Sequence, residues 1–250
     1  GFNSALTNNS EYRDRIDHLR RERAIYDKLY RTLSKEQEDL KQKIGGVIDE
    51  SVRPGIALAE KLGQIVAGLA QSSIVSVEFE ARGEIAAHDV TVLKLAALKG
   101  IFQTMVTEQV SYVNAPLMAE SRGIEVRLVQ DTVSDEYRNV TTVKAVLSDG
   151  SVVSVGGTVI GPKHHQKVVS INGYDVELSM AENLVVMVYQ DRPGIVAIYG
   201  KAFAEASINI AAMTIARQQK GGKALAVITV DSPVDAAVLE SVKIEIDADL

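Results

Sequence analysis

A short polar segment, Tyr189-Gln-Asp-Arg-Pro-Gly-Ile195, has the residue types and spacing to bind a free amino acid. It precedes a helical pattern, so the backbone amides at the start of this helix would point toward the segment and attract a carboxylate. Asp191 could pair with an ammonium group, and Asn209, on a strand that returns from the helix, can both donate and accept hydrogen bonds. Tyr189 would supply a hydroxyl at the mouth of this pocket. An Asp-x-Pro-Gly turn is also typical of a helix start that binds nothing, and this alternative stays open.

The elements that would position these residues follow one another in a regular order. Residues 183–189 are apolar and β-branched and predict a buried strand, while residues 194–206 have helical spacing, with Asp191 as cap and Pro193 near the first turn. Strands are predicted over 208–218 and 224–231, and Ser232-Pro233 begins a second helix. A short strand over 245–247 would close a ferredoxin-like β-α-β-β-α-β unit of about seventy residues.

These motifs carry a specific resemblance. Asp191-Arg-Pro-Gly-Ile195 and Ile208-Asn-Ile-Ala211, on this order of elements, resemble the ACT domain, a small regulatory module that binds amino acids. Several motifs upstream look like the intervening domain of long bacterial D-3-phosphoglycerate dehydrogenases: Pro54-Gly-Ile-Ala-Leu-Ala-Glu-Lys-Leu-Gly63, Leu95-Ala-Ala-Leu-Lys-Gly100, Val113-Asn-Ala-Pro116, Gly157-Thr158 with Gly161-Pro162, and Ile171-Asn-Gly173. The resemblance implies an L-serine pocket at a dimer interface, with these ligand-binding residues: Tyr189, Asp191, Ile195 and Asn209.

Two positions depart from the pattern of that family. Ser207 stands where such domains commonly have glycine, at a position suited to positive φ after a helix. Long family members also have a basic anion site on the intervening domain. Here Lys167 is a possible remnant of this second site, whereas Tyr174 and Ser179 are not basic.

The middle of the chain has enough length and apolar content for a core of its own. Helices are predicted for residues 58–69 and 88–106, and strands for 74–81, 124–130, 140–147, 152–160 and 167–171, with Val75, Val77 and Phe79 on one side of the first strand. Asp149-Gly150 and Asn172-Gly173 are typical of hairpin turns. We therefore expect three parts: an N-terminal helical segment over 1–50, an intervening domain over 51–179 and an ACT domain over 180–250.

The N-terminal part differs in character from the rest. Residues 11–42 are dense in Arg, Lys and Glu, and apolar residues follow a heptad pattern that predicts a long helix in a coiled coil. Because the basic residues are interleaved with acids, a solvated coiled-coil face explains them better than nucleic-acid or membrane binding. The abrupt change near Gly45-Gly46 suggests a fusion of unlike parts.

Several functional classes find no support in the sequence. No glycine-rich β-α-β unit for a dinucleotide is recognisable, no acid/base pair or metal cluster is apparent, and we expect no cofactor and no enzyme activity for this chain alone. The four histidines are scattered, and there is no cysteine for a disulfide or a thiolate nucleophile. A net charge of −6 gives no reason to expect nucleic acid, and without a run of eighteen apolar residues or a signal-peptide pattern we expect a cytoplasmic protein with no membrane partner.

The sequence therefore predicts an α+β protein with an N-terminal long helix, an α/β intervening domain and a C-terminal ferredoxin-like ACT domain. Its expected function is non-catalytic regulation, in which L-serine or a similar small amino acid binds a homodimer formed through the ACT domain and the N-terminal helix. Two alternatives stay open. The chain could be a scaffold with an idle pocket, or a subunit similar to that of the iron–sulfur L-serine dehydratases.

Overall fold

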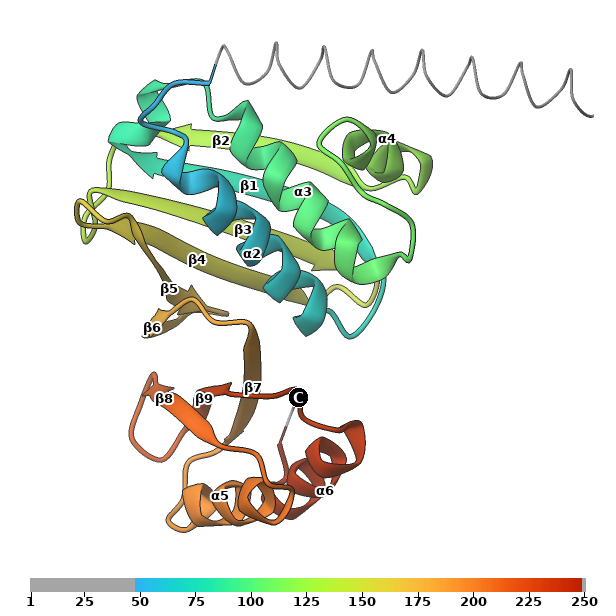
Figure 1. Ribbon diagram of the computed structural model, residues 1–250, viewed down its shortest axis with the longest axis vertical. Coiled ribbons are helices and arrows are strands. Elements are labelled where there is room, and N and C mark those ends of the chain that lie inside the picture. The colour runs from blue at the N-terminus through green and yellow to red at the C-terminus, as the bar shows by residue number, and fades with distance from the viewer. Residues whose placement is uncertain (1–47, 249–250) are drawn as a thin grey trace, which may run out of the picture. The chain divides into compact units, whose positions relative to one another are not determined.

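The computed structural model describes residues 48–248, and from Asp49 onward the chain forms one compact unit. This unit contains two β-sheets, each with helices on one face (Figure 1). The architecture confirms the predicted α+β class. The predicted coiled-coil segment over 1–50 lies almost wholly outside the described residues.

The first sheet has six strands in the order β2-β1-β3-β4-β5-β6. β1 pairs with β2 in parallel, and the other neighbours are antiparallel. The strands have these bounds: β1 Ile74–Gly83, β2 Glu125–Asp131, β3 Asn139–Leu147, β4 Val152–Ile160, β5 His165–Ile171 and β6 Tyr174–Ser179. The helices are α2 (Pro54–Leu69), the short 3-10 helix η1 (Glu84–Ala87), α3 (Thr91–Met105) and α4 (Asn114–Ser121). α2 and α3 run side by side across one face of the sheet (Figure 1).

Two glycines allow α2 and α3 to pack closely. A Cβ atom at Gly63 would lie 2.1 Å from the carbonyl oxygen of Ala97, and one at Gly100 would lie 1.9 Å from that of Glu60. Real Cβ atoms do not approach backbone oxygens so closely, so each helix needs a glycine where its partner crosses. The apolar faces of both helices then bury Leu58, Leu62 and Leu93 against the sheet.

Most predicted elements of this region are confirmed, but η1, α4 and β6 were not predicted and Val75 lies on the other face of β1. Val75 was expected to share the buried face of β1 with Val77 and Phe79, but it is 48% exposed. A register irregularity between Ile74 and Ser76 reverses the alternation at the start of the strand, so the expectation for Val75 was wrong. In α4 only two of the eight residues, Ala115 and Ala119, are buried, and Leu117 is 60% exposed, so the segment shows no clear apolar face.

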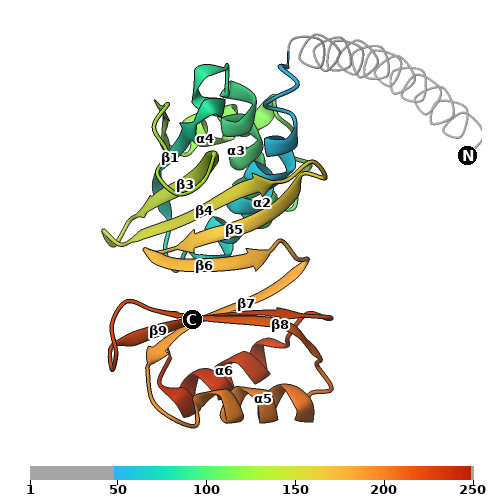
Figure 2. The same cartoon turned by 90° about the vertical axis from the view of Figure 1, so that its left-hand side faces the viewer.

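The second sheet has three antiparallel strands in the order β7-β9-β8: β7 (Asn183–Gln190), β8 (Ile210–Arg217) and β9 (Lys223–Val230). α5 (Ile195–Glu205) and α6 (Ala236–Ile246) cover one face of this sheet (Figure 2). Their contact with the strands buries Tyr199, Phe203 and Ile246 in a core of their own. Residues 48–248 contain no helix that is both long and apolar enough to cross a membrane.

The predicted closing strand over 245–247 is wrong. Glu245 and Ile246 belong to α6, because Val242 and Ile246 lie one helical turn apart and are both buried. The described part of the second domain is therefore β-α-β-β-α. The prediction for Ser207 is confirmed: its φ is +58°, and it reverses the chain directly after α5.

Candidate functional site

Asp191 directly follows the last residue of β7 and lies in the turn that precedes α5. It was expected to cap this helix, but the N-cap residue is Gly194, which has a left-handed backbone conformation with a φ of +97°. No side chain caps the helix. Instead, Oδ2 of Asp191 accepts a hydrogen bond of 2.9 Å from Nη1 of Arg217, at the end of β8. The backbone amide of Asp191 also donates to the carbonyl of Gly222. The carboxylate is thus held beside the helix start by the neighbouring strand and turn.

The first amides of α5 are free to bind an acceptor. The amides of Ala197 and Ile198 donate to the carbonyl of Gly194, whereas those of Ile195 and Val196 donate to no acceptor among residues 48–248. Free amides at the positive end of a helix dipole favour a carboxylate. Ile195 itself is buried and anchors this first turn in the core. The turn therefore combines two free donors with one carboxylate, which matches the two charged groups of an amino acid.

Tyr189 lies deeper than the sequence suggested. Its hydroxyl was expected at the mouth of the pocket, yet the residue is 3% exposed in this protomer and interacts with Tyr199 of α5. Burial raises the pKa of both phenols, and the nearby carboxylate of Asp191 adds to the rise of the Tyr189 pKa. The Tyr199 hydroxyl donates to the sulfur of Met213 on β8, at 2.9 Å. Both tyrosines therefore remain neutral at physiological pH and support the pocket from its core side.

Asn209 lies at the other end of the sheet. It immediately precedes β8, and its Nδ2 donates to Oδ2 of Asp231 at 2.7 Å. Because Ile210 pairs with Val230 and Arg217 pairs with Ala224, β8 runs its full length between Asn209 and the Arg217–Asp191 pair. Eight residues of extended strand span roughly 25 Å. One protomer therefore does not bring Asp191 and Asn209 together.

β8 is an edge strand with an apolar surface. In the order β7-β9-β8 it pairs on one side with β9, and its other side has no strand partner in residues 48–248. Met213 and Ile215 of this strand are 40% and 42% exposed. An apolar unpaired edge of this length is typical of a surface that pairs with another chain.

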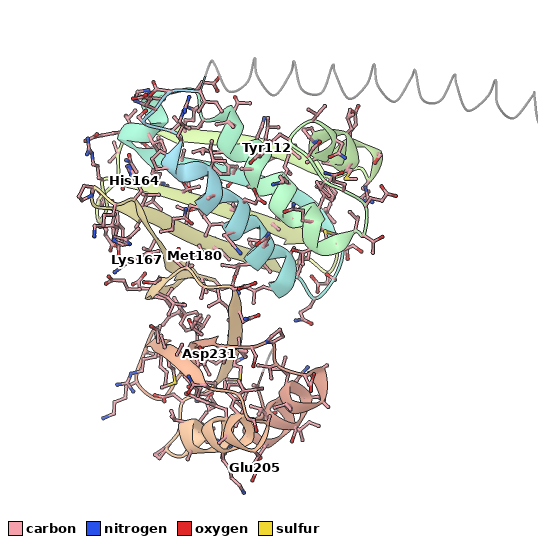
Figure 3. All side chains as sticks on the ribbon, viewed as in Figure 1. Tyr112, His164, Lys167, Met180, Glu205 and Asp231 are labelled. Atoms are coloured by element: carbon pink, nitrogen blue, oxygen red, sulfur yellow. The ribbon has the colours of Figure 1, made fainter. Side chains whose placement is uncertain are left out.

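Lys167, the expected remnant of a second anion site, lies on β5 and is labelled in Figure 3. Its ammonium forms an ion pair with Glu177 of β6, and Ser179 lies opposite it in the register. Its charge is therefore balanced within the sheet. Among residues 48–248 no cluster of His, Asp and Glu could hold a metal ion.

Three residues that contact the candidate ligand residues were not predicted from the sequence: Arg217, Asp231 and Tyr199. Each reaches the site from another element, and no short motif connects it with Asp191 or Asn209. The hairpin turn at 220–223 could have indicated the position of Arg217. Once the register of the β8–β9 hairpin is known, the end of β8 lies near the start of the turn after β7, since β7 and β8 both pair with the start of β9.

Two family models match different parts of the chain. Residues 51–172 match a family model described as the D-3-phosphoglycerate dehydrogenase intervening domain. Residues 1–54 match a model described as the ODAD1 central coiled coil region.

Curated relatives extend the similarity toward the C-terminus. The D-3-phosphoglycerate dehydrogenases of Mycobacterium leprae and Mycobacterium tuberculosis are each 36% identical over 204 residues, which is 82% of this chain and 39% of theirs. The enzyme of Methanocaldococcus jannaschii is 31% identical over 193 residues, or 77% of this chain and 36% of its own. The chain thus spans less than half the length of the relatives that it matches.

Proposed function

We propose that this chain, whose residues 51–172 belong to the D-3-phosphoglycerate dehydrogenase intervening-domain family, is a regulatory region that binds L-serine between two copies of its C-terminal domain. In this proposal residues 180–250 act as an ACT domain. The proposed site residues are Tyr189, Asp191, Ile195 and Asn209. Asp191 and Asn209 contact the ligand with their side chains and Ile195 with its backbone amide, while Tyr189 supports the pocket from its core side. The chain itself carries out no reaction, and its role belongs to the control of serine biosynthesis in the cytoplasm.

The observation that carries the proposal is the pairing of two free amides with one carboxylate at the start of α5. The amides of Ile195 and Val196 would receive the carboxylate of serine, and Asp191 would receive its ammonium. The side-chain hydroxyl of serine would then need a partner that can donate and accept, such as the amide of Asn209.

A two-fold axis across β8 would complete this pocket. If the β8 edges of two protomers pair antiparallel, the Arg217 end of one strand lies beside the Ile210 end of the other. Asp191 of one protomer then faces Asn209 of its partner. Within one protomer the two residues cannot meet, because they lie roughly 25 Å apart. The same pairing would cover the exposed side chains of Met213 and Ile215.

Regulation would follow from this shared pocket. A ligand that contacts both protomers favours the one relative arrangement in which both sets of contacts can form. Serine would therefore stabilise the dimer and fix the relative orientation of the two C-terminal domains.

A second candidate is a scaffold in which the pocket is idle. The coiled-coil match over residues 1–54 favours it, because a coiled coil can hold copies together without any amino acid. A catalytic partner that copurifies with the chain would instead support the alternative of a subunit similar to that of the iron–sulfur L-serine dehydratases.

Calorimetric titration of L-serine into the full chain tests the proposal, with glycine and D-serine as comparators. We expect saturable L-serine binding that Asp191→Ala abolishes, while Asp135→Ala, an exposed aspartate in the first domain, leaves it unchanged. An absence of heat and of thermal stabilisation at millimolar L-serine would refute the pocket and favour the scaffold.

A further inference from the structure

Two polar side chains are buried within residues 48–248, and both line the same cavity. Thr141 on β3 and Thr158 on β4 are each 3% exposed. They lie in the wall of a cavity of about 860 Å³ in the first domain. This cavity shares no residue with the proposed serine pocket.

The cavity lies where the ends of several elements meet. Its walls come from the start of α2, from η1, from residues 136–139 before and at the start of β3, and from the end of β4 with the following turn. Figure 3 shows His164 of that turn at one end of the six-stranded sheet. Pro54, Leu58 and Ile160 give the cavity an apolar lining between its polar groups.

The hydroxyl of Thr141 has no partner among the described residues. Thr158 Oγ1 donates to the carbonyl of Asn139 at 2.6 Å, and the side-chain oxygen of Asn139 accepts from the amide of Ile85. These bonds involve Thr158 and both oxygens of Asn139 and do not include the neighbouring Thr141. Thr141 lines the cavity wall, so its hydroxyl is open to the cavity and can bond a molecule that is held there.

The charges around the cavity indicate which kind of molecule this is. Arg138 is paired with Glu84 at 2.6 Å, and His88 is paired with Asp49 at 2.8 Å. Glu50 and Glu136 also line the cavity and have no ion-pair partner in residues 48–248. The unbalanced charge is therefore negative, which favours a cation and disfavours phosphate or carboxylate ligands.

We propose that this cavity binds a small aliphatic amine that carries a hydroxyl group, an amino alcohol. Its ammonium faces the carboxylates of Glu50 and Glu136, and its methylene groups pack on the apolar lining. Its hydroxyl hydrogen-bonds Thr141, whose own hydroxyl makes no hydrogen bond within residues 48–248 and lines the cavity. The two ends of such a ligand thus match the two kinds of unpaired group in the cavity.

The test is calorimetric titration of the full chain with ethanolamine and with 5-amino-1-pentanol. The comparators are 1-pentanol, which lacks the positively charged ammonium group, and inorganic phosphate, which is negatively charged. We expect saturable binding of an amino alcohol, and Thr141→Val should weaken it about fivefold through the loss of one hydrogen bond. Glu136→Gln should weaken it by a similar factor, and Thr141→Ser, which keeps the hydroxyl, should retain it.

Matched variants separate a local effect from a general one. Thr142→Val changes the next residue of β3, which does not line the cavity, and Glu108→Gln removes an exposed charge elsewhere; neither should alter amine binding. Asp191→Ala should also leave it intact, so failure here is distinguishable from failure of the serine pocket. The proposal is overturned if neither amine saturates at millimolar concentration, if phosphate or 1-pentanol binds as well, or if folded Thr141→Val binds like the unsubstituted chain.

Discussion

Arg217 donates a hydrogen bond from Nη1 to Oδ2 of Asp191 across 2.9 Å, and this contact ties the end of β8 to the turn before α5. The side chain of Asp191 is 27% exposed, so the pair is accessible from the edge of the sheet. The Arg217–Asp191 pair and Asn209 lie at opposite ends of β8, and the proposed pocket therefore needs a second protomer.

The shared pocket can be tested by complementation. Asp191→Asn and Asn209→Ala should each abolish L-serine binding, because each removes one half of every site. In a mixture of the two variants, each heterodimer would contain one intact site and one that lacks both residues. Random exchange should restore about a quarter of the unsubstituted sites, as measured by the stoichiometry of the titration.

The mixture must be compared with each variant measured by itself under the same exchange conditions. If the mixture binds no more serine than the separate variants, Asp191 and Asn209 do not act across an interface.

Arg217 should modulate the affinity of the same pocket. Its guanidinium and the ammonium of serine would both be attracted to Asp191, and these two cations repel each other. Arg217→Gln should therefore increase L-serine affinity by up to about fivefold, the range expected from an exposed ion pair. Titration calorimetry of the variant measures this change.

Arg127→Gln is the matched control, because Arg127 forms a similarly exposed pair with Glu125 on β2. Weaker serine binding by Arg217→Gln would contradict the competition and would show that Arg217 positions Asp191 for the ligand.

The close approach of α2 and α3 predicts opposite effects of two alanine substitutions in one helix. Gly63→Ala would place a Cβ atom 2.1 Å from the Ala97 carbonyl oxygen, so the helices must separate. We expect a loss of roughly 1–3 kcal/mol in the free energy of unfolding. Gly68→Ala, also in α2, meets nothing within 4 Å and should stabilise the protein by about 0.5–1 kcal/mol.

Urea unfolding of both variants measures these changes. Equal stabilities would show that the crossing of α2 and α3 is looser than the structure indicates.

Tyr199 should make the protein less stable in alkali. Burial raises its pKa above the ordinary value of 10.0, so the unfolded chain loses this proton at a lower pH than the folded protein does. The contribution of Tyr199 is fully present below about pH 10 and is lost as the pH rises toward the folded-state pKa. Tyr199→Phe should therefore lose less stability than the unsubstituted chain between about pH 8 and about pH 11 in urea unfolding.

Tyr137→Phe, in the loop before β3, provides the control for a tyrosine that is less buried. If Tyr199→Phe and the unsubstituted chain lose the same free energy over this pH range, ionisation of Tyr199 does not limit alkaline stability.

Local patterns predicted most elements correctly because each depends on a few adjacent residues. The apolar spacing of Leu58, Leu62 and Val66 defined a helix, and the Asn172-Gly173 turn adopts the positive φ angles that these residues favour. Predictions failed where a distant contact competes with the local pattern. The segment after Lys243 has strand-like alternation, but the burial of Val242 and Ile246 against the second sheet extends α6 through it.

The candidate ligand residues could be predicted from the sequence, because the types of Asp191 and Asn209 and the turn between strand and helix are local properties. Their arrangement in space could not, because it depends on how the strands pair. Pairing of β8 with β9 places Arg217 on Asp191 and carries Asn209 to the far end of the sheet. The cavity that Thr141 lines likewise forms only when η1, α2 and the end of β4 come together. Strand register and burial join residues far apart in the chain, and no spacing along the sequence encodes such contacts directly.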